Sequence, residues 1–205
     1  MLSLTEPLHD ELIYKGHRLT LDLSFDVVLL WFDLLDSDLT EGEKIQQGFD
    51  NVVQSAALFT LEEKAEILQQ TMDYVLEPTY GQMEENTVYK QTPVDKTRFF
   101  SYSKDAEAIY ASFYKEYKID LVKERGKLHY LKFSALLDGL SEESYFKRII
   151  KIRKANPADY EGEDLTELIQ AQQYYALDEK ITTANLNQQM GNMFDLVSVK
   201  AKEGE

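Results

Sequence analysis

The side chains best suited to transfer protons or ligate metals are three histidines, at positions 9, 17 and 129. A zinc site of the metalloprotease type needs two imidazoles one helical turn apart, as in the HExxH motif, and no pair of these histidines has that spacing. His129 could exchange a proton on its own, but a single histidine beside Tyr130 in a helical segment is more often a structural hydrogen-bonding group. The histidines therefore predict neither a metal site nor an acid–base catalyst.

Other catalytic arrangements are also missing from the sequence. No cysteine is present, so a thiolate nucleophile and disulfides are excluded, and no serine stands in a GxSxG elbow. The nine glycines form no phosphate-binding loop ahead of a helix. Adjacent carboxylates such as Glu62 and Glu63 diverge around a helix axis, and at a helix start the macrodipole already favours them. The sequence therefore predicts a protein that is not an enzyme and needs no cofactor.

A cluster of cations is the strongest chemical feature of the sequence. The chain is acidic overall, with a formal net charge of −15, and this charge disfavours nucleic-acid binding. The cluster interleaves with three isoleucines that can be buried while the basic stems spread over the flanks. These cations either compensate the helix dipole and pair with the chain's own carboxylates, or form a docking patch for an acidic or helical partner. The second interpretation makes them candidate partner-binding residues: Lys147, Arg148, Lys151, Arg153 and Lys154.

An aromatic set on two consecutive predicted helices has the composition that protein interfaces favour. Its members are Tyr110, Phe113, Tyr114, Tyr117, Tyr130 and Phe133. The alternative is that the set forms a core between the two helices, and we expect this for Tyr110, Phe113 and Phe133. Tyr114 and Tyr130 are expected on the surface and join the cations as candidate partner-binding residues.

The elements that would position these residues begin with a predicted domain over residues 1–77. Alternating apolar residues on both sides of Gly16 predict a short hairpin, which we expect to be the only sheet. A broad apolar arc over residues 24–36 predicts a buried helix with Trp31 in the core. Two capping-box spacings predict the starts of two further helices: Thr40 to Glu43 and Thr60 to Glu63.

Residues 78–102 lose helical periodicity and are predicted to form a long connection. Residues 103–178 are predicted to form a helical C-terminal half with four helices, at about 103–119, 127–139, 142–154 and 164–177, the first capped by Ser103 and the third by Ser141. Residues 179–205 are predicted to be a flexible tail, apart from an apolar island at 193–197 that either docks on its own domain or orders on a partner. The whole pattern predicts a mainly α fold, a helical bundle with a small N-terminal β-hairpin.

Composition and charge also set the expected surroundings of the protein. A chain of 205 residues with 43% hydrophobic residues can bury a sizeable core. The longest apolar run, residues 27–32, is too short to span a bilayer, and the start of the chain has no secretory signal pattern. Together with the lack of cysteine, these features favour a reducing cytoplasm and predict no membrane contact.

The segment from Ser103 to Arg153 resembles a bacteriophage protein family. The resemblance is carried by Asp105, Ile109-Tyr110-Ala111-Ser112-Phe113, Tyr117, Ile119-Asp120-Leu121, His129, Phe133, Leu136-Leu137, Gly139-Leu140, Phe146, Ile149-Ile150 and Arg153. That family is named after gene product fifteen of a Listeria phage and is encoded between the major tail genes and the tape measure gene. The resemblance implies a protein of phage tail morphogenesis that works in the host cytoplasm, either a tail assembly chaperone or an accessory that binds the tape measure protein.

The expected partners follow from the same resemblance. They are the tape measure protein, other tail assembly proteins and further copies of this chain in a homo-oligomer, with no nucleic acid. An alternative motivated by the acidic composition is a non-enzymatic inhibitor or a structural component of the phage particle that acts on another protein.

Overall fold

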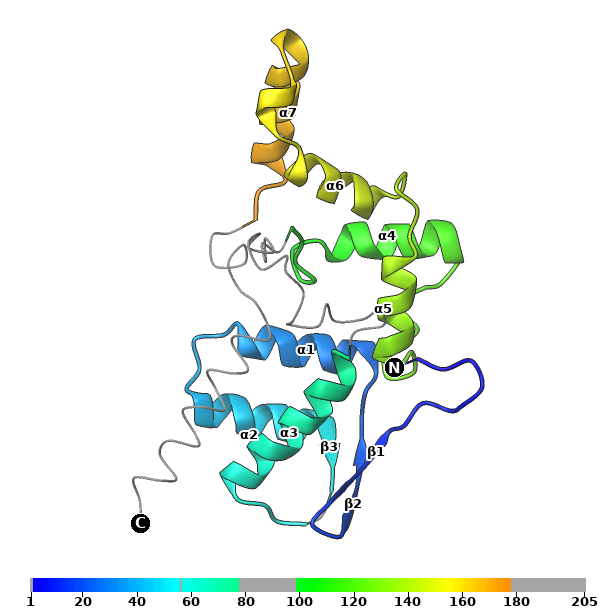
Figure 1. Ribbon diagram of the computed structural model, residues 1–205, viewed down its shortest axis with the longest axis vertical. Coiled ribbons are helices and arrows are strands. Elements are labelled where there is room, and N and C mark those ends of the chain that lie inside the picture. The colour runs from blue at the N-terminus through cyan, green and yellow to red at the C-terminus, as the bar shows by residue number, and fades with distance from the viewer. Residues whose placement is uncertain (1, 56, 78–98, 178–205) are drawn as a thin grey trace, which may run out of the picture. The chain divides into compact units, whose positions relative to one another are not determined.

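A computed structural model of the chain describes residues 2–55, 57–77 and 99–177 (Figure 1). These residues form seven α-helices, one short 3-10 helix and a three-stranded antiparallel sheet, so the predicted mainly α fold with an N-terminal hairpin is confirmed. Most of the expected connection, the polar tail and its apolar island lie outside the described residues. No described helix has the length and apolar composition that crossing a membrane would require.

The described residues divide into two compact units. The first unit contains residues 2–77 and Arg125–Phe133, and the second contains residues 99–124 and 134–177. The segment Arg125–Phe133 thus clusters with residues far earlier in the chain.

The sheet of the first unit is built on a tight hairpin between β1 (Glu11–Tyr14) and β2 (His17–Leu21). Lys15 and Gly16 join the strands with φ of 48° and 85°, and a two-residue hairpin turn of type I′ requires positive φ at both positions. A third strand, β3 (Val53–Gln54), pairs with β2 on its other edge. The sequence prediction lacked β3, because two residues are too few to show an alternating pattern.

Three helices of the first unit lie between the hairpin and residue 77: α1 (Phe25–Leu35), α2 (Glu41–Val52) and α3 (Leu61–Val75). Both predicted capping boxes are confirmed, since the Thr40 and Thr60 hydroxyls accept the backbone N–H groups of residues 43 and 63. α2 packs against both α1 and α3. Trp31 is fully buried in the core, as predicted.

The segment Arg125–Phe133 is bonded to the residues between β2 and α1. The Phe25 N–H donates to the Leu128 carbonyl oxygen over 2.8 Å, and the Tyr130 N–H donates to the Leu23 carbonyl oxygen over 2.8 Å. The rings of Phe25 and Phe133 stack with centroids 4.9 Å apart. These contacts explain why this segment belongs to the first unit.

The second unit holds α4 (Ala106–Tyr117), the end of α5 (Tyr130–Asp138), α6 (Tyr145–Lys154), the 3-10 helix η1 (Pro157–Asp159) and α7 (Gly162–Tyr174). Its core includes Phe113 and Phe146, both buried. The buried Ser112 hydroxyl joins α4 to α6, because it donates to the Ala108 carbonyl over 2.7 Å and accepts the Phe146 N–H over 3.1 Å.

Two helix starts in this unit differ from the sequence prediction. α4 begins after Asp105, not Ser103, and α6 begins after Ser144, not Ser141. Ser144 caps α6 by accepting the Lys147 N–H, whereas the Ser141 hydroxyl donates to Glu116 over 2.6 Å. Hydrogen bonds from the Ser141 hydroxyl and N–H hold the pKa of the Glu116 carboxyl below its ordinary value.

Candidate partner-binding site

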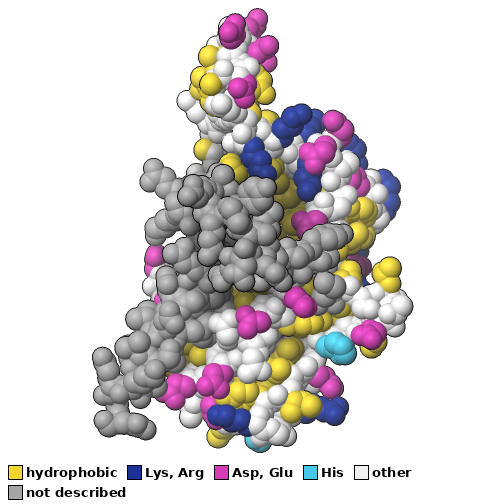
Figure 2. All heavy atoms as spheres, viewed as in Figure 1, with side chains coloured by type: hydrophobic (Ala, Val, Ile, Leu, Met, Phe, Trp, Pro, Cys, Tyr) yellow, Lys and Arg dark blue, Asp and Glu magenta, His cyan; other side chains and the backbone are white. Residues whose placement is uncertain are grey.

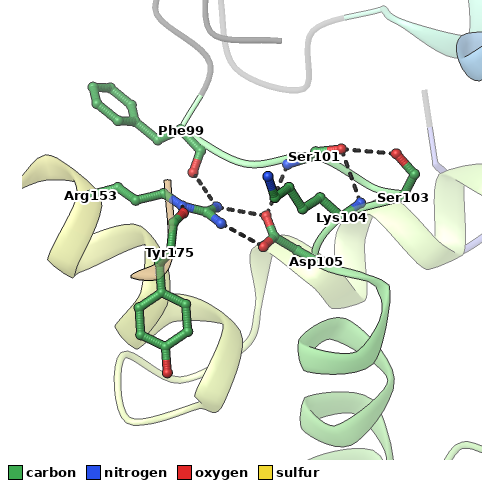
Figure 3. Close-up of polar contacts among 7 residues, drawn as sticks. All are labelled: Phe99, Ser101, Ser103, Lys104, Asp105, Arg153 and Tyr175. Carbon is green, nitrogen blue, oxygen red and sulfur yellow. Dashed lines mark hydrogen bonds and ion pairs between the residues drawn. The ribbon is translucent and has the colours of Figure 1, made fainter. Parts of the chain in front are cut away.

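A buried ion pair positions α6 in the second unit (Figure 3). The guanidinium of Arg153 donates to both carboxylate oxygens of Asp105, over 2.7 and 2.8 Å, in the bidentate geometry that arginine forms with carboxylates. The same guanidinium donates to the carbonyl oxygens of Tyr175 and Phe99, over 2.6 and 3.0 Å. Arg153 thereby ties the end of α6 to the start of α4, to the residue after α7 and to the chain entering the unit.

Asp105 is held from a second direction as well. The Ser101 N–H donates to Asp105 Oδ2 over 3.0 Å, and only 4% of the Asp105 side chain is exposed. The Arg153 side chain is 7% exposed. The expectation that Arg153 belongs to an exposed docking patch is therefore wrong. Its guanidinium is buried and donates four hydrogen bonds to groups inside the second unit.

The other four cations of the cluster form what we call the basic face of α6: Lys147, Arg148, Lys151 and Lys154. Arg148, Lys151 and Lys154 are exposed, and Lys147 is partly exposed, its Nζ donating to the Asp138 carbonyl over 3.2 Å. The opposite side of α6 buries Phe146 and Ile149, so the helix separates apolar and basic sides as the sequence predicted.

Arg148 and Lys151 are the least engaged members of the basic face. Neither side chain makes a hydrogen bond or an ion pair with another described residue, while the Lys154 Nζ lies over the Phe99 ring at 5.1 Å. Figure 2 shows Lys and Arg side chains gathered around α4 and α6, and Asp and Glu side chains gathered on α7. Long basic side chains that have no partner in the described part of the chain can bind an acidic surface.

The two candidate tyrosines lie in different environments. Tyr114 on α4 is 53% exposed, in agreement with its expected surface position, and its ring stacks on Tyr110 with centroids 6.2 Å apart. Tyr130 is only 4% exposed, so its expected surface position is wrong. The Tyr130 ring packs edge-on against Phe32 inside the first unit, which removes it from any docking surface.

Tyrosines that the sequence analysis did not single out lie next to the basic face. Tyr145 starts α6 with 39% exposure, and Tyr174 ends α7 with 80% exposure. A hydrogen bond with the Tyr175 side chain raises the pKa of the Tyr145 hydroxyl, and partial burial raises it further. The spacing of Tyr145 three positions before Arg148 on a helix was a signal available in the sequence, but the approach of α7 was not.

A pocket in the first unit is a candidate for a small-molecule site. It has a volume of about 260 Å³ and is lined by Asp10, Asp22, Gln54, Lys127 and His129, among others. His129 Nδ1 accepts the Leu131 N–H over 3.0 Å, and His129 Nε2 lies 3.2 Å from Asp10 Oδ1 without a well-oriented hydrogen bond. His129 therefore forms part of the pocket wall as a structural hydrogen-bonding group, with its Nε2 shielded from solvent.

Metal ligation finds no support in the described part of the chain. No group of three or more His, Asp or Glu side chains there is placed to hold a metal ion.

Comparison with known proteins defines the class of this molecule as a bacteriophage protein. The family model described as Bacteriophage Gp15 protein matches residues 8–177, which include most of the described residues of both units. The chain therefore belongs to the Bacteriophage Gp15 protein family. This membership supports a phage structural or morphogenesis protein. No curated protein and no solved structure shows significant similarity to the chain.

Proposed function

We propose that this protein acts in phage tail morphogenesis as a tail assembly chaperone or accessory that binds the tape measure protein and catalyses no reaction. Family membership over residues 8–177 supports a role in building the phage particle. The resemblance of residues 103–153 to proteins encoded beside the tape measure gene supports the choice of partner. The work would take place in the host cytoplasm, where phage proteins are made and assembled.

The observation that carries the proposal is the basic face of α6 on a chain with a net charge of −15. A long amphipathic tape measure helix exposes an apolar stripe and tends to aggregate before the tail tube forms around it. The aliphatic stems of Arg148 and Lys151 can cover part of such a stripe, while their charged ends pair with acidic residues beside it. The negative charge of the remaining chain then keeps the complex in solution.

A second candidate function is a structural component or inhibitor that binds a different phage or host protein. The exposed Tyr114 next to Tyr110 favours an additional polypeptide contact on α4, because tyrosines with one exposed edge are frequent at interfaces. A protein inventory of purified phage particles separates the two functions, since a chaperone leaves the particle and a structural component stays in it.

Co-expression with the tape measure protein tests the main proposal. The parent chain is expected to keep the tape measure protein in the soluble fraction and to copurify with it. The double charge reversal R148E/K151E is expected to lose both effects, because the exposed side chains then repel acidic residues on the partner. The matched control K115E/K132E changes the net charge equally at two other exposed lysines and should behave like the parent. If the two double variants behaved alike, the basic face of α6 would not be the surface that binds the tape measure protein.

A further inference from the structure

The pocket of the first unit lies at one end of the three-stranded sheet. Asp10 directly precedes β1, and its carbonyl oxygen accepts the Leu21 N–H over 2.7 Å. Asp22 directly follows β2, and its N–H donates to the Val52 carbonyl oxygen over 2.8 Å. Gln54 belongs to β3, which pairs with β2 at the same end. Backbone pairing therefore brings two carboxylates and one amide from three neighbouring strands to one pocket.

The segment Arg125–Phe133 supplies a further wall of the pocket, with Lys127 and His129. Only 8% of His129 is exposed, and its Nε2 has no hydrogen-bond partner, although it faces Asp10 Oδ1 at 3.2 Å. Because Nδ1 accepts the Leu131 N–H, the neutral imidazole carries its proton on Nε2. A ligand that holds Asp10 from the pocket side would let this buried N–H complete its hydrogen bond to the same carboxylate.

The pocket presents more acceptors than donors. Asp22 Oδ1 accepts the N–H and the hydroxyl of Ser24, over 3.1 and 2.6 Å, and these bonds fix the direction of the carboxylate. Asp22 Oδ2 and the Gln54 side chain have no hydrogen bond with another described residue. Burial lowers the pKa of His129 below 6.5, so this residue is neutral at about pH 7.5. Two carboxylates and one lysine ammonium then leave the pocket negative, which favours a cation.

The size and the side chains of the pocket indicate which cation fits. Its volume of about 260 Å³ is smaller than the roughly 300–1,000 Å³ of sites for drug-sized ligands, and suits the end of one side chain. Three carboxylate or imidazole ligands for a metal ion are not brought together anywhere in the described ranges. A guanidinium has five N–H donors in one plane and can bind several carboxylate and amide oxygens at once.

We propose that this pocket binds the guanidinium of an arginine side chain on a partner polypeptide. Asp10 and Asp22 pair with the guanidinium, and the Gln54 side-chain oxygen accepts a further N–H. The Asp10 side chain is 52% exposed, so an arginine can reach it from solvent. This inference does not rest on the proposed function, because the pocket lies in the first unit and the basic face lies on α6 in the second.

NMR titration of the nitrogen-15-labelled full chain tests the site without any variant. The probe is arginine capped as Nα-acetyl-arginine methylamide, which is expected to shift the amide signals of Ser24, Gln54 and Gly126 with a dissociation constant on the order of 1 mM. The equally capped citrulline, which is neutral, should cause no such shifts, and capped lysine should bind more weakly. Equal effects of the arginine and citrulline probes, or shifts spread over the acidic surface without a centre at the pocket, would overturn the inference.

Two further probes decide the chemical class and the source of the ligand. Equal affinity for capped lysine would show that the pocket does not select a guanidinium. Free L-arginine should bind no better than the capped residue. If free arginine bound about tenfold more tightly, the pocket would be a site for the free amino acid and not for a polypeptide side chain.

Substitutions around the pocket make the test specific. D10N is expected to weaken binding of capped arginine at least about fivefold, and K127Q to strengthen it, because the first removes a paired carboxylate and the second a repelling ammonium. D138N is the matched control, since Asp138 is an exposed carboxylate of the second unit and its side chain has no hydrogen bond with other described residues. D138N should bind like the parent, and circular dichroism should show that all three variants are folded. Equal affinities of D10N and D138N would contradict the assignment of the pocket.

Discussion

The carboxylate of Asp105 and the guanidinium of Arg153 are 48 residues apart in the chain and meet in a buried, bidentate ion pair. Breaking such a pair by removing one partner leaves the other charge buried without compensation. We expect R153M to lower the free energy of unfolding by about 3–5 kcal/mol, as measured by urea denaturation. R153K should fall between R153M and the parent, since lysine keeps the charge but not the bidentate geometry.

Arg148 provides the matched control for this experiment. It lies on the same helix, is exposed and has no partner among the described residues, so R148M should change stability by less than about 0.5 kcal/mol. An equal effect of R153M and R148M would contradict the structural role of the ion pair.

Ser112 gives a second prediction about how α4 and α6 are held together. S112A removes the acceptor of the buried Phe146 N–H, and leaving such a donor unsatisfied costs about 1–3 kcal/mol. Chemical denaturation should therefore show a lower midpoint for S112A than for the parent. S134A is the control, because the Ser134 side chain has no hydrogen bond with other described residues. Similar midpoints for both alanine variants would speak against the role of the Ser112 hydroxyl.

Gly48 tests the packing between α1 and α2 in the first unit. A Cβ atom at this position would lie 3.1 Å from Trp31 Nε1 and 3.2 Å from Trp31 Cδ1, and Trp31 is fully buried and unable to give way freely. We expect G48A to lower the thermal midpoint through an overpacking cost of about 1–3 kcal/mol. G42A, whose Cβ would meet Leu61 at an ordinary 3.6 Å, should be neutral or stabilising.

The free energy of unfolding should depend on pH in part through protonation of His129. Burial, which outweighs the attraction of Asp10, lowers the pKa of His129 below its ordinary 6.5. Below pH 6.5 the unfolded chain therefore binds more protons at this histidine than the folded chain does. The contribution of His129 to the free energy of unfolding is complete above pH 6.5 and decreases as the pH falls toward the pKa of His129 in the folded chain. Unfolding free energies measured at about pH 7.5 and about pH 5.5 should differ more for the parent than for H129N.

Asparagine is chosen because its side-chain oxygen can replace Nδ1 as the acceptor of the Leu131 N–H without titrating. The exposed His9 supplies the control, and H9N should keep the pH dependence of the parent. A full pH dependence in H129N would assign the effect to other groups.

Local signals in the sequence predicted much of the fold. Capping boxes at Thr40 and Thr60 involve residues three positions apart, and the hairpin turn at Lys15 and Gly16 is equally local. Each of these features is determined by neighbouring residues, so a pattern along the chain is sufficient to find it. The amphipathic division of α6 was predictable for the same reason.

The mispredicted features depend on tertiary contacts. The helical spacing after Phe146 and Ile149 places Arg153 on the buried face of α6, but its partner Asp105 is 48 residues away and no local pattern identifies it. Likewise, nothing next to Tyr130 indicates that its ring packs on Phe32. The start of α4 was misplaced because Asp105 uses its carboxylate to bind Arg153 and Ser101, so no side-chain cap marks the helix start. Pairings between distant segments decided each of these cases.

The proposed binding of the tape measure protein by the exposed basic face of α6 can be measured as the affinity between the purified proteins. Dissociation constants should be measured for the parent, R148E/K151E and K115E/K132E against the same tape measure protein. We expect the parent and the control to bind, and R148E/K151E to bind at least about tenfold more weakly, a loss of about 1.4 kcal/mol. Equal affinities for all three chains, or no binding by the parent, would show that the basic face is not the binding surface.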